Sequence, residues 1–424
     1  MMRTSSVREL VARSTGLGGA LSPQSLARWQ MDRLREQIAW AQRAPHYRQT
    51  LRHIQGCDLK TTEDLPRLPF TTAEHLRHAP ASLVCVSQGE VARIITLATS
   101  GTSGRHKRIF FSEHDLARCM DFFAQGMRDM VSPGGLVHIL LPGNTEGGTV
   151  DLLHNALGRD GVRVALHGFP RQPEKIDFFA LPALPKEHPD CLLGQPVAIL
   201  RVAHAHPGLR PTRVLLCADY VPLSIIARIE RMWGSEVFTH YGSTESGLGG
   251  GVECCARQGY HWRHDDLLLE IVDPLTGAAL PPGQWGEVVI TTLRRKAMPL
   301  IRYRTGDRGR LLNTPCPCGC DLPRLDRIAG RFDNDLHFSG GGRLSIHMLD
   351  EILFALPEVL DYTAVLRDDF TLELSVCTRP DASFQKVRDA LEECGAIPKP
   401  FTLHQNTCLP LSPAKRVIQR NHAV

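Results

Sequence analysis

Short apolar runs alternate with helix-length segments between about residues 82 and 242, and this alternation constrains the fold more than any other feature. The segments read in order "VARIITLA", "DLARCMDFFAQGMRDM", "LVHILLPG", "VRVALHG", "VAILRVA", "RVLLCADY", "IIARIERMWG" and "EVFTHYG". Strand-length runs separated by helical segments are typical of a sheet of mostly parallel strands covered by helices. The sequence therefore predicts an α/β fold.

The regions on either side of this pattern have a different texture. Residues 23–53 have helical periodicity, and residues 260–313 show short apolar runs with turn signals between them, which favours a small antiparallel β section. After "RIAGRFDND" the pattern predicts a compact α+β unit. We expect a large N-terminal domain over residues 1–331 with mixed or parallel sheets, and a small C-terminal domain over residues 332–424.

The bulk properties exclude several classes of partner. The 424 residues carry a formal charge of only +4, which is too small to favour nucleic acid or an anionic membrane surface. No apolar run approaches the roughly 20 residues that span a bilayer, and the N-terminus has no continuous apolar stretch typical of a secretory signal. We expect a cytoplasmic protein without nucleic-acid or membrane partners, for which a homodimer is allowed.

A loop rich in small and basic residues follows the first of the apolar runs. It reads "TSGTSGRHK" from Thr99 to Lys107. Small residues expose backbone N–H groups and the cations neutralise negative charge, so the loop could cradle phosphate. A plain surface turn explains the same residues equally well.

Two further stretches place a carboxylate beside glycine and hydroxyl residues. In "HYGSTES", Glu245 could hold Mg²⁺ because hard cations take oxygen ligands, although Ser243 or Thr244 could instead cap a helix. In "YRTGDRGRL", Asp307 follows a glycine on an expected turn and could accept hydrogen bonds from ribose hydroxyls. The alternative there is an ordinary hairpin turn.

These stretches occur in an order that resembles a known family, the adenylate-forming enzymes and most closely their phenylacetate–CoA ligase branch. The phosphate loop of that family is similar to "TSGTSGRHK", and its later motifs are similar to "YGSTE", "YRTGD" and the hinge "GRFDN". The segments "APHYRQTL" and "LPRLPFTTAEHLR" resemble the N-terminal part of the same branch, so the likeness covers nearly the whole chain.

The resemblance implies that a carboxylic acid and ATP give an acyl-AMP and pyrophosphate, before the acyl group passes to a thiol. It implies ATP/AMP, Mg²⁺ and coenzyme A as cofactors. The nucleotide-binding positions would be Thr99, Ser100, Gly101, Thr102, Ser103, Gly104, Lys107, Tyr241, Gly242, Asp307 and Arg331. The catalytic positions would be Thr244 at the α-phosphate, Glu245 at Mg²⁺, and Lys415.

The C-terminal part departs from the branch at two positions. The branch carries a lysine that bridges acid and phosphate, and Lys415 in "LPLSPAKRVIQR" is the candidate, although alignment of "KRVI" puts Pro413 at that place. Asp333 falls at the hinge about which the small domain of the family rotates, and Asn334 replaces the second acid of the motif.

Five of the thirteen cysteines cluster in two segments, "VECCARQGYH" and "PCPCGCD". In a reducing compartment such clustering indicates a metal rather than disulfides. Zinc takes about four nitrogen and sulfur ligands, and the best set is Cys254, His261, Cys316 and Cys318, within a β section of about residues 252–322. Cys255 and Cys320 are the substitutes, and buried free thiols are the alternative.

The leading hypothesis is therefore an acid–thiol ligase that makes an acyl-CoA from an aryl or arylacetic acid. Its partners would be a small carboxylic acid and coenzyme A. One alternative is an enzyme that stops after nucleotide transfer, as relatives that adenylate a deazaflavin cofactor do. Another is a non-catalytic, zinc-bearing scaffold that binds a nucleotide.

Overall fold

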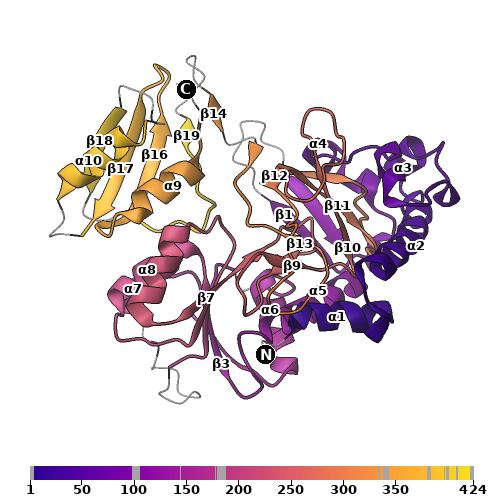
Figure 1. The fold of residues 1–424 in the computed structure, drawn as a ribbon, viewed down its shortest axis with the longest axis horizontal. Coiled ribbons are helices and arrows are strands. Elements are labelled where there is room, and N and C mark those ends of the chain that lie inside the picture. Colours follow the sequence, from indigo (N-terminus) through magenta and orange to yellow (C-terminus); the bar gives the residue numbers. More distant parts are fainter. Residues whose placement is uncertain are drawn as a thin grey trace. The chain divides into compact units, whose positions relative to one another are not determined.

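The computed structural model describes most of the chain, and its described residues form two compact units (Figure 1). The described residues are 4–97, 106–143, 145–176, 178, 188–332, 335–337, 343–379, 383–395, 397, 401–406 and 409–420. The first unit comprises Met1–Ser132, Thr145–Gly161 and His240–Ile328. The second comprises Pro133–Asn144, Val162–Thr239 and Ala329–Val424. The chain therefore passes between the units several times.

Helices of the first unit come mainly from the N-terminal third of the chain. They are α1 (Ser6–Thr15), α2 (Pro23–Ala41), α3 (Pro45–Thr50), α4 (Ala73–His78), α5 (Glu113–Met127) and α6 (Thr149–Arg159). Helix α5 begins where Ser112 and Asp115 form reciprocal side-chain to backbone hydrogen bonds. Because that cap directly follows a strand, it fixes the direction in which the chain leaves the strand.

The strands of the first unit are antiparallel. They are β1 (Arg93–Leu97), β2 (Lys107–Phe111), β8 (Gly251–Val252), β9 (Tyr260–Trp262), β10 (Leu267–Val272), β11 (Gly286–Thr292), β12 (Tyr303–Gly309) and β13 (Arg324–Leu325). Strand β1 pairs with β2, β11 lies between β10 and β12, and β9 lies between β8 and β13. The apolar side chains of α2, β2 and β10–β12 share one core.

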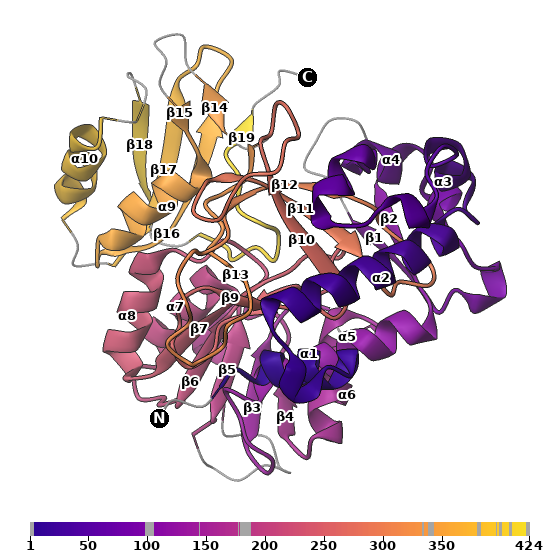
Figure 2. The ribbon, with the colours of Figure 1, turned by 45° about the vertical axis from the view of Figure 1, so that its right-hand side comes forward.

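The second unit contains the parallel sheet that the sequence predicts. Its strands are β3 (Leu136–Leu140), β4 (Arg163–Leu166), β5 (Cys191–Gly194), β6 (Arg213–Leu216) and β7 (Glu236–Tyr241), whose last two residues belong to the first unit. The order is β4-β3-β5-β6-β7, all parallel (Figure 2). Helices α7 (Pro196–Ala205) and α8 (Leu223–Trp233) connect the last three strands and bury their apolar faces in the same core.

The C-terminal residues add a second, smaller sheet to this unit. The C-terminal elements are β14 (Leu336–His337), β15 (Arg343–Leu344), α9 (Ile346–Ala355), β16 (Val359–Leu366), β17 (Leu372–Thr378), α10 (Phe384–Glu393), β18 (Phe401–Asn406) and β19 (Gln419–Arg420), and β14 pairs only with β15 among the described residues. The strands β18, β17, β16 and β19 lie side by side in that order. Apolar residues of α9 and β16 join the core formed by α7 and α8.

The predicted α/β fold is confirmed, with two refinements. Strand β1, which follows the apolar pattern of the parallel strands, instead forms an antiparallel pair with β2 and so brackets the glycine-rich loop. The run Val197–Ala203 is helical, and the neighbouring strand is β5. Among the described residues no helix combines the length and apolar character needed to cross a membrane. The division at residue 331 stays a prediction.

Candidate active site

The "YGSTE" motif occupies the end of strand β7 and the turn that follows it. Ser243 and Ser246 exchange hydrogen bonds between backbone N–H and side-chain hydroxyl, at 2.9 and 3.2 Å. The backbone N–H of Gly247 donates to the carbonyl of Thr244 at 3.1 Å, and Gly247 has φ +79°. No helix begins here among the described residues, so Ser243 and Thr244 are not helix caps. The half-buried Thr244 and Gly242 lie on this same segment.

Glu245 is the most enclosed group of the motif, with 3% of its surface exposed. Lys107 on β2 donates from Nζ to Glu245 Oε1 at 2.5 Å, and the hydroxyl of Tyr303 on β12 donates to the same oxygen at 2.9 Å. Burial is the largest single influence and would raise the pKa of Glu245, but the Lys107 charge and the hydrogen bonds from Lys107, Tyr303 and the backbone together lower the pKa to about 2. The carboxylate is therefore ionised, as a ligand for a hard cation must be.

Asp307 lies within strand β12 rather than on the turn that the sequence suggested. Gly306, at φ +76°, falls where the pairing of β12 with β11 shifts register, and its N–H donates to Glu287 Oε1 at 3.0 Å. Such a bulge re-aims the side chain that follows it. The hydroxyl of Tyr241 donates to Asp307 Oδ2 at 2.7 Å, while the Tyr241 ring stacks 6.0 Å from that of Trp262. Tyr241 and Asp307, from two separate motifs, are thus in direct contact.

The remaining predicted nucleotide and hinge positions are placed less completely. Residues Thr99, Ser100, Gly101, Thr102, Ser103 and Gly104 lie outside the described residues, as do Asp333 and Asn334. Arg331 and Lys415 belong to the second unit, where Arg331 is half-buried and Lys415 is exposed. The structure therefore brings Lys107 to Glu245 and Tyr241 to Asp307, and the roles of all the predicted positions in nucleotide binding stay predictions.

The segment that carries Lys415 is held through its neighbours. The backbone N–H of Arg416 donates to Asp219 at 3.0 Å, and its guanidinium donates to Asp350 at 3.1 Å and to Asp361 at 2.7 Å. Gln195 donates to the carbonyl of Pro413 at 2.9 Å. These contacts fix the backbone on both sides of Lys415.

Three cysteines and one histidine of the first unit converge in a second cluster. Cys254, His261, Cys316 and Cys318 are buried, and their ligand atoms all lie within 4.8 Å of one another. The sulfurs of Cys254 and Cys316 are 3.6 Å apart, and Cys318 Sγ is 3.6 Å from His261 Nε2. Of the substitutes, Cys320 is buried and Cys255 is half-buried. The four residues that the sequence analysis favoured as zinc ligands are therefore the four whose possible ligand atoms lie together.

Two side chains that the sequence analysis did not single out contact Glu245. One is Tyr303, described above, and the other is Arg295, whose Nη2 donates to the backbone carbonyl of Glu245 at 3.3 Å. Tyr303 is the first residue of the motif "YRTGD", and Arg295 lies eight residues before it in "RRKAMPLIRYRTGD". Membership of the motif could have drawn attention to Tyr303, whereas proximity to it is the one sequence signal for Arg295.

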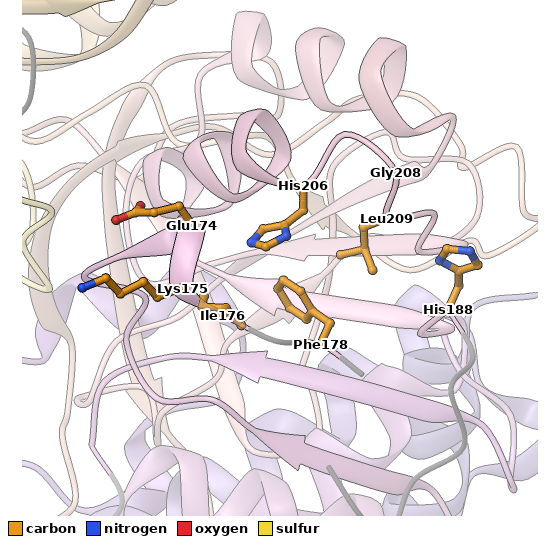
Figure 3. Close-up of a pocket in the computed structure, with 8 residues that line it drawn as sticks. All are labelled: Glu174, Lys175, Ile176, Phe178, His188, His206, Gly208 and Leu209. Carbon is orange, nitrogen blue, oxygen red and sulfur yellow. The ribbon is translucent and has the colours of Figure 1, made fainter. Parts of the chain in front are cut away.

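A pocket of about 510 Å³ lies elsewhere, in the second unit. In the close-up, the side chains of His206, Phe178 and Leu209 point into one space, with His188 at one end (Figure 3). His188 precedes β5 and Leu209 precedes β6, whereas Glu174, Lys175 and Ile176 follow β4. The pocket contains none of the predicted site residues.

Comparison with known proteins identifies close relatives over most of the chain. A phenylacetate–coenzyme A ligase of Thermus thermophilus is 33% identical over 374 residues, covering 83% of this chain and 81% of the relative. A phenylacetate–coenzyme A ligase of Aromatoleum evansii is 31% identical over 336 residues, covering 75% and 73%. No protein-family model matches the chain.

Solved structures show the same fold at lower sequence identity. The structure of 2-hydroxyisobutyryl-CoA ligase in the postadenylation state, in complex with R3-HIB-AMP, matches with a TM-score of 0.78 at 21% identity. The match covers 93% of this chain and 89% of the other. This likeness extends over nearly all of both chains.

Proposed function

The chain belongs to the phenylacetate–coenzyme A ligase family and is therefore an AMP-forming acid–coenzyme A ligase, and we propose that its acid is an aryl or arylacetic acid. In the first half-reaction the carboxylate of the acid attacks the α-phosphorus of ATP, which forms acyl-AMP and releases pyrophosphate. In the second, the thiol of coenzyme A displaces AMP and the acyl-CoA leaves.

The aryl or arylacetic acid is proposed because the relatives are phenylacetate–coenzyme A ligases. The observation that carries activation of the acid by ATP is the meeting of three motifs at Glu245. A buried, ionised carboxylate bonded by Lys107 and Tyr303 is an oxygen ligand suited to Mg²⁺. Bound Mg²⁺ would supply stabilisation of the charge that develops on the phosphate oxygens. Lys107, at the end of the glycine-rich loop, adds a positive charge for the same phosphates. Thr244 on the adjoining turn would contact the α-phosphate.

The nucleoside would be recognised where Tyr241 of "YGSTE" contacts Asp307 of "YRTGD". Asp307 accepts a hydrogen bond from Tyr241, and its carboxylate would accept further hydrogen bonds from ribose hydroxyls. The family resemblance adds Arg331 and Gly242 to this part of the site and gives Lys415 the bridge between acid and phosphate. Rotation about Asp333 would then exchange the adenylation arrangement for the thioester-forming one.

Zn²⁺ fits the cysteine–histidine cluster as a structural ion. Tetrahedral zinc with a Zn–S distance of about 2.3 Å places two sulfurs about 3.7 Å apart and a sulfur and a nitrogen about 3.5 Å apart. The observed separations are both 3.6 Å. Cys254, His261, Cys316 and Cys318 would close the site, which leaves no open position for chemistry and assigns the ion to folding.

Acid-dependent pyrophosphate release tests the function and identifies the acid. The purified protein would be incubated with Mg·ATP and a panel of aryl, arylacetic and short aliphatic acids, each with and without coenzyme A. We expect release with an aryl or arylacetic acid. Release without any thioester would favour an enzyme that stops at adenylation, and nucleotide binding without release would favour the scaffold.

We also propose a cytoplasmic location. ATP and coenzyme A are supplied there, and the cysteines of the described residues are all free thiols, as a reducing compartment would keep them.

A further inference from the structure

The turn that carries Glu245 rests on a buried arginine that no motif includes. Arg295 is 4% exposed and lies between β11 and β12, and its Nη2 donates to the backbone carbonyl of Glu245 at 3.3 Å. Its Nη1 has no hydrogen-bond partner among the described residues. Because a buried guanidinium with incomplete hydrogen bonding is costly, its presence at this turn calls for a purpose.

The backbone around Arg295 is fixed from two sides. The N–H groups of Lys296 and Ala297 donate to the Asp115 carboxylate at 2.8 and 2.9 Å. From helix α2, Gln37 Nε2 donates to the carbonyl of Arg295 at 2.8 Å. Asp115 lies in the first turn of α5, whose N-cap Ser112 directly follows β2, the strand that carries Lys107. The backbone around the arginine is therefore anchored to the helix that follows this strand.

The guanidinium also contacts that strand and the far side of the turn. It lies 4.9 Å from the centre of the Phe111 ring at the end of β2. A Cβ added to Gly247 would come within 2.8 Å of Arg295 Nη2, so the turn packs directly onto the arginine. One side chain thus links β2, the carbonyl of Glu245 and the backbone of Gly247.

We propose that Arg295 is a positioning residue that holds the Glu245 turn in register with Lys107, so that the carboxylate faces the metal-bearing phosphates of ATP. The proposal rests on the proposed function for the role of Mg²⁺. It assigns to Arg295 no contact with substrate. Lys107 and Tyr303 fix the Glu245 side chain, and Arg295 fixes the backbone from which that side chain extends.

The test compares Arg295→Met and Arg295→Lys with Arg228→Met as a matched control. Arg228 is likewise buried, and its guanidinium donates to the backbone carbonyls of Val359 and Pro357 and contacts the ring of His204. It lies on helix α8 of the second unit. Loss of either arginine should lower the melting temperature, so stability alone does not distinguish them.

Amide hydrogen exchange measures the stability of the turn directly and needs no bound metal. The N–H groups of Gly247 and Leu248 donate to Thr244 and Ser243 within the turn. In Arg295→Met these two amides should exchange at least about tenfold faster than in the wild type. The increase should be smaller in Arg295→Lys, because a positively charged donor remains, and the exchange rate should be unchanged in Arg228→Met. Unchanged exchange at both amides in Arg295→Met would overturn the proposal.

Calorimetry tests the consequence for nucleotide affinity. It measures the binding of a non-hydrolysable Mg·ATP analogue and, separately, of metal-free AMP. Arg295→Met should weaken the Mg·nucleotide at least about fivefold and AMP less than about twofold. Equal weakening of both ligands would contradict a role at the metal-bearing phosphates. Should the wild-type protein bind no Mg·nucleotide, the proposed function fails, whereas the exchange result still decides whether Arg295 holds the turn. If Arg295→Met does not fold, Arg295→Lys is compared with the wild type by the same hydrogen-exchange and calorimetric measurements.

Discussion

Glu245 and Lys415 are the two charged groups that the sequence places closest to the adenylation step, and they lie in opposite environments. Glu245 is buried and receives hydrogen bonds from side chains on two strands, whereas Lys415 is exposed on a C-terminal segment. The carboxylate is already held in position by the folded unit. The exposed lysine keeps its rotamer freedom, and in the proposed role it would act only once the segment brought it to the reacting groups.

From this difference we infer that Glu245 is positioned by the fold itself, whereas Lys415 would reach the reacting groups through a movement of the C-terminal residues. Around Lys415 it is the backbone that is held, through Pro413 and Arg416. Rotation of the C-terminal residues, as the family resemblance implies, would then move the lysine without disturbing Glu245. Substitutions at the two positions should therefore differ in which half-reaction they affect.

The largest effect is expected for Glu245→Gln. The amide can still accept hydrogen bonds from Lys107 and Tyr303, but it lacks the charge with which we propose that Glu245 binds Mg²⁺. Acyl-AMP formation should fall by at least about a hundredfold, measured as pyrophosphate release, while circular dichroism remains that of the folded protein. Normal pyrophosphate release from a well-folded variant would remove Glu245 from the mechanism.

The next effect is expected for Lys415→Ala, with Lys415→Arg as the control that keeps the charge. Acyl-AMP formation should fall by about thirtyfold or more, because the cation acts only while charge develops at the α-phosphate. Thioester formation from supplied acyl-AMP should change less than about twofold. Unchanged adenylation would mean that Lys415 has no such role. Arg416 is poorly suited to replace it, since its guanidinium is bonded to Asp350 and Asp361.

Asp333→Pro tests whether motion delivers the lysine. A fixed φ restricts rotation without touching a reacting group, so one half-reaction should slow about tenfold more than the other. Asp333→Ala, which leaves rotation free, is the control, and each half-reaction is assayed separately. If both half-reactions slowed equally, simple destabilisation would explain the result better than a hinge.

The smallest effect on chemistry is expected at the cysteine cluster. The purified protein should contain about one zinc per chain, and Cys316→Ser should lose the metal and several degrees of melting temperature together. Cys255→Ser, at a half-buried cysteine outside the four, should keep both. Elemental analysis and thermal unfolding provide the two readouts. Wild-type protein without metal would contradict the assignment, as would a Cys316→Ser variant that melts unchanged.

Much of this arrangement could be predicted from sequence because the critical groups lie in short motifs. Glu245, Asp307 and Lys107 stand at fixed spacings from glycines and hydroxyl residues, and the four favoured zinc ligands stand in two compact segments. The parallel sheet followed from the spacing of apolar runs. In each case the informative residues are close together in the chain.

The remainder depends on contacts between distant segments. Strand β1 has the composition of a parallel strand, yet it pairs antiparallel with β2. Asp307 was expected on a turn, and only the register shift between β11 and β12 shows that Gly306 bends a strand. Arg295 reaches Glu245 across 50 residues, a pairing that no local pattern encodes.

The central claim is that one chain converts an acid, ATP and coenzyme A into an acyl-CoA, and the most direct test is the balance of products. The protein would be incubated with Mg·ATP, coenzyme A and the acid most active in pyrophosphate release, and all products quantified by mass spectrometry. We predict acyl-CoA, AMP and pyrophosphate in equal amounts, with no ADP. AMP and pyrophosphate without acyl-CoA, or no acid-dependent turnover with any acid of the panel, would contradict the account.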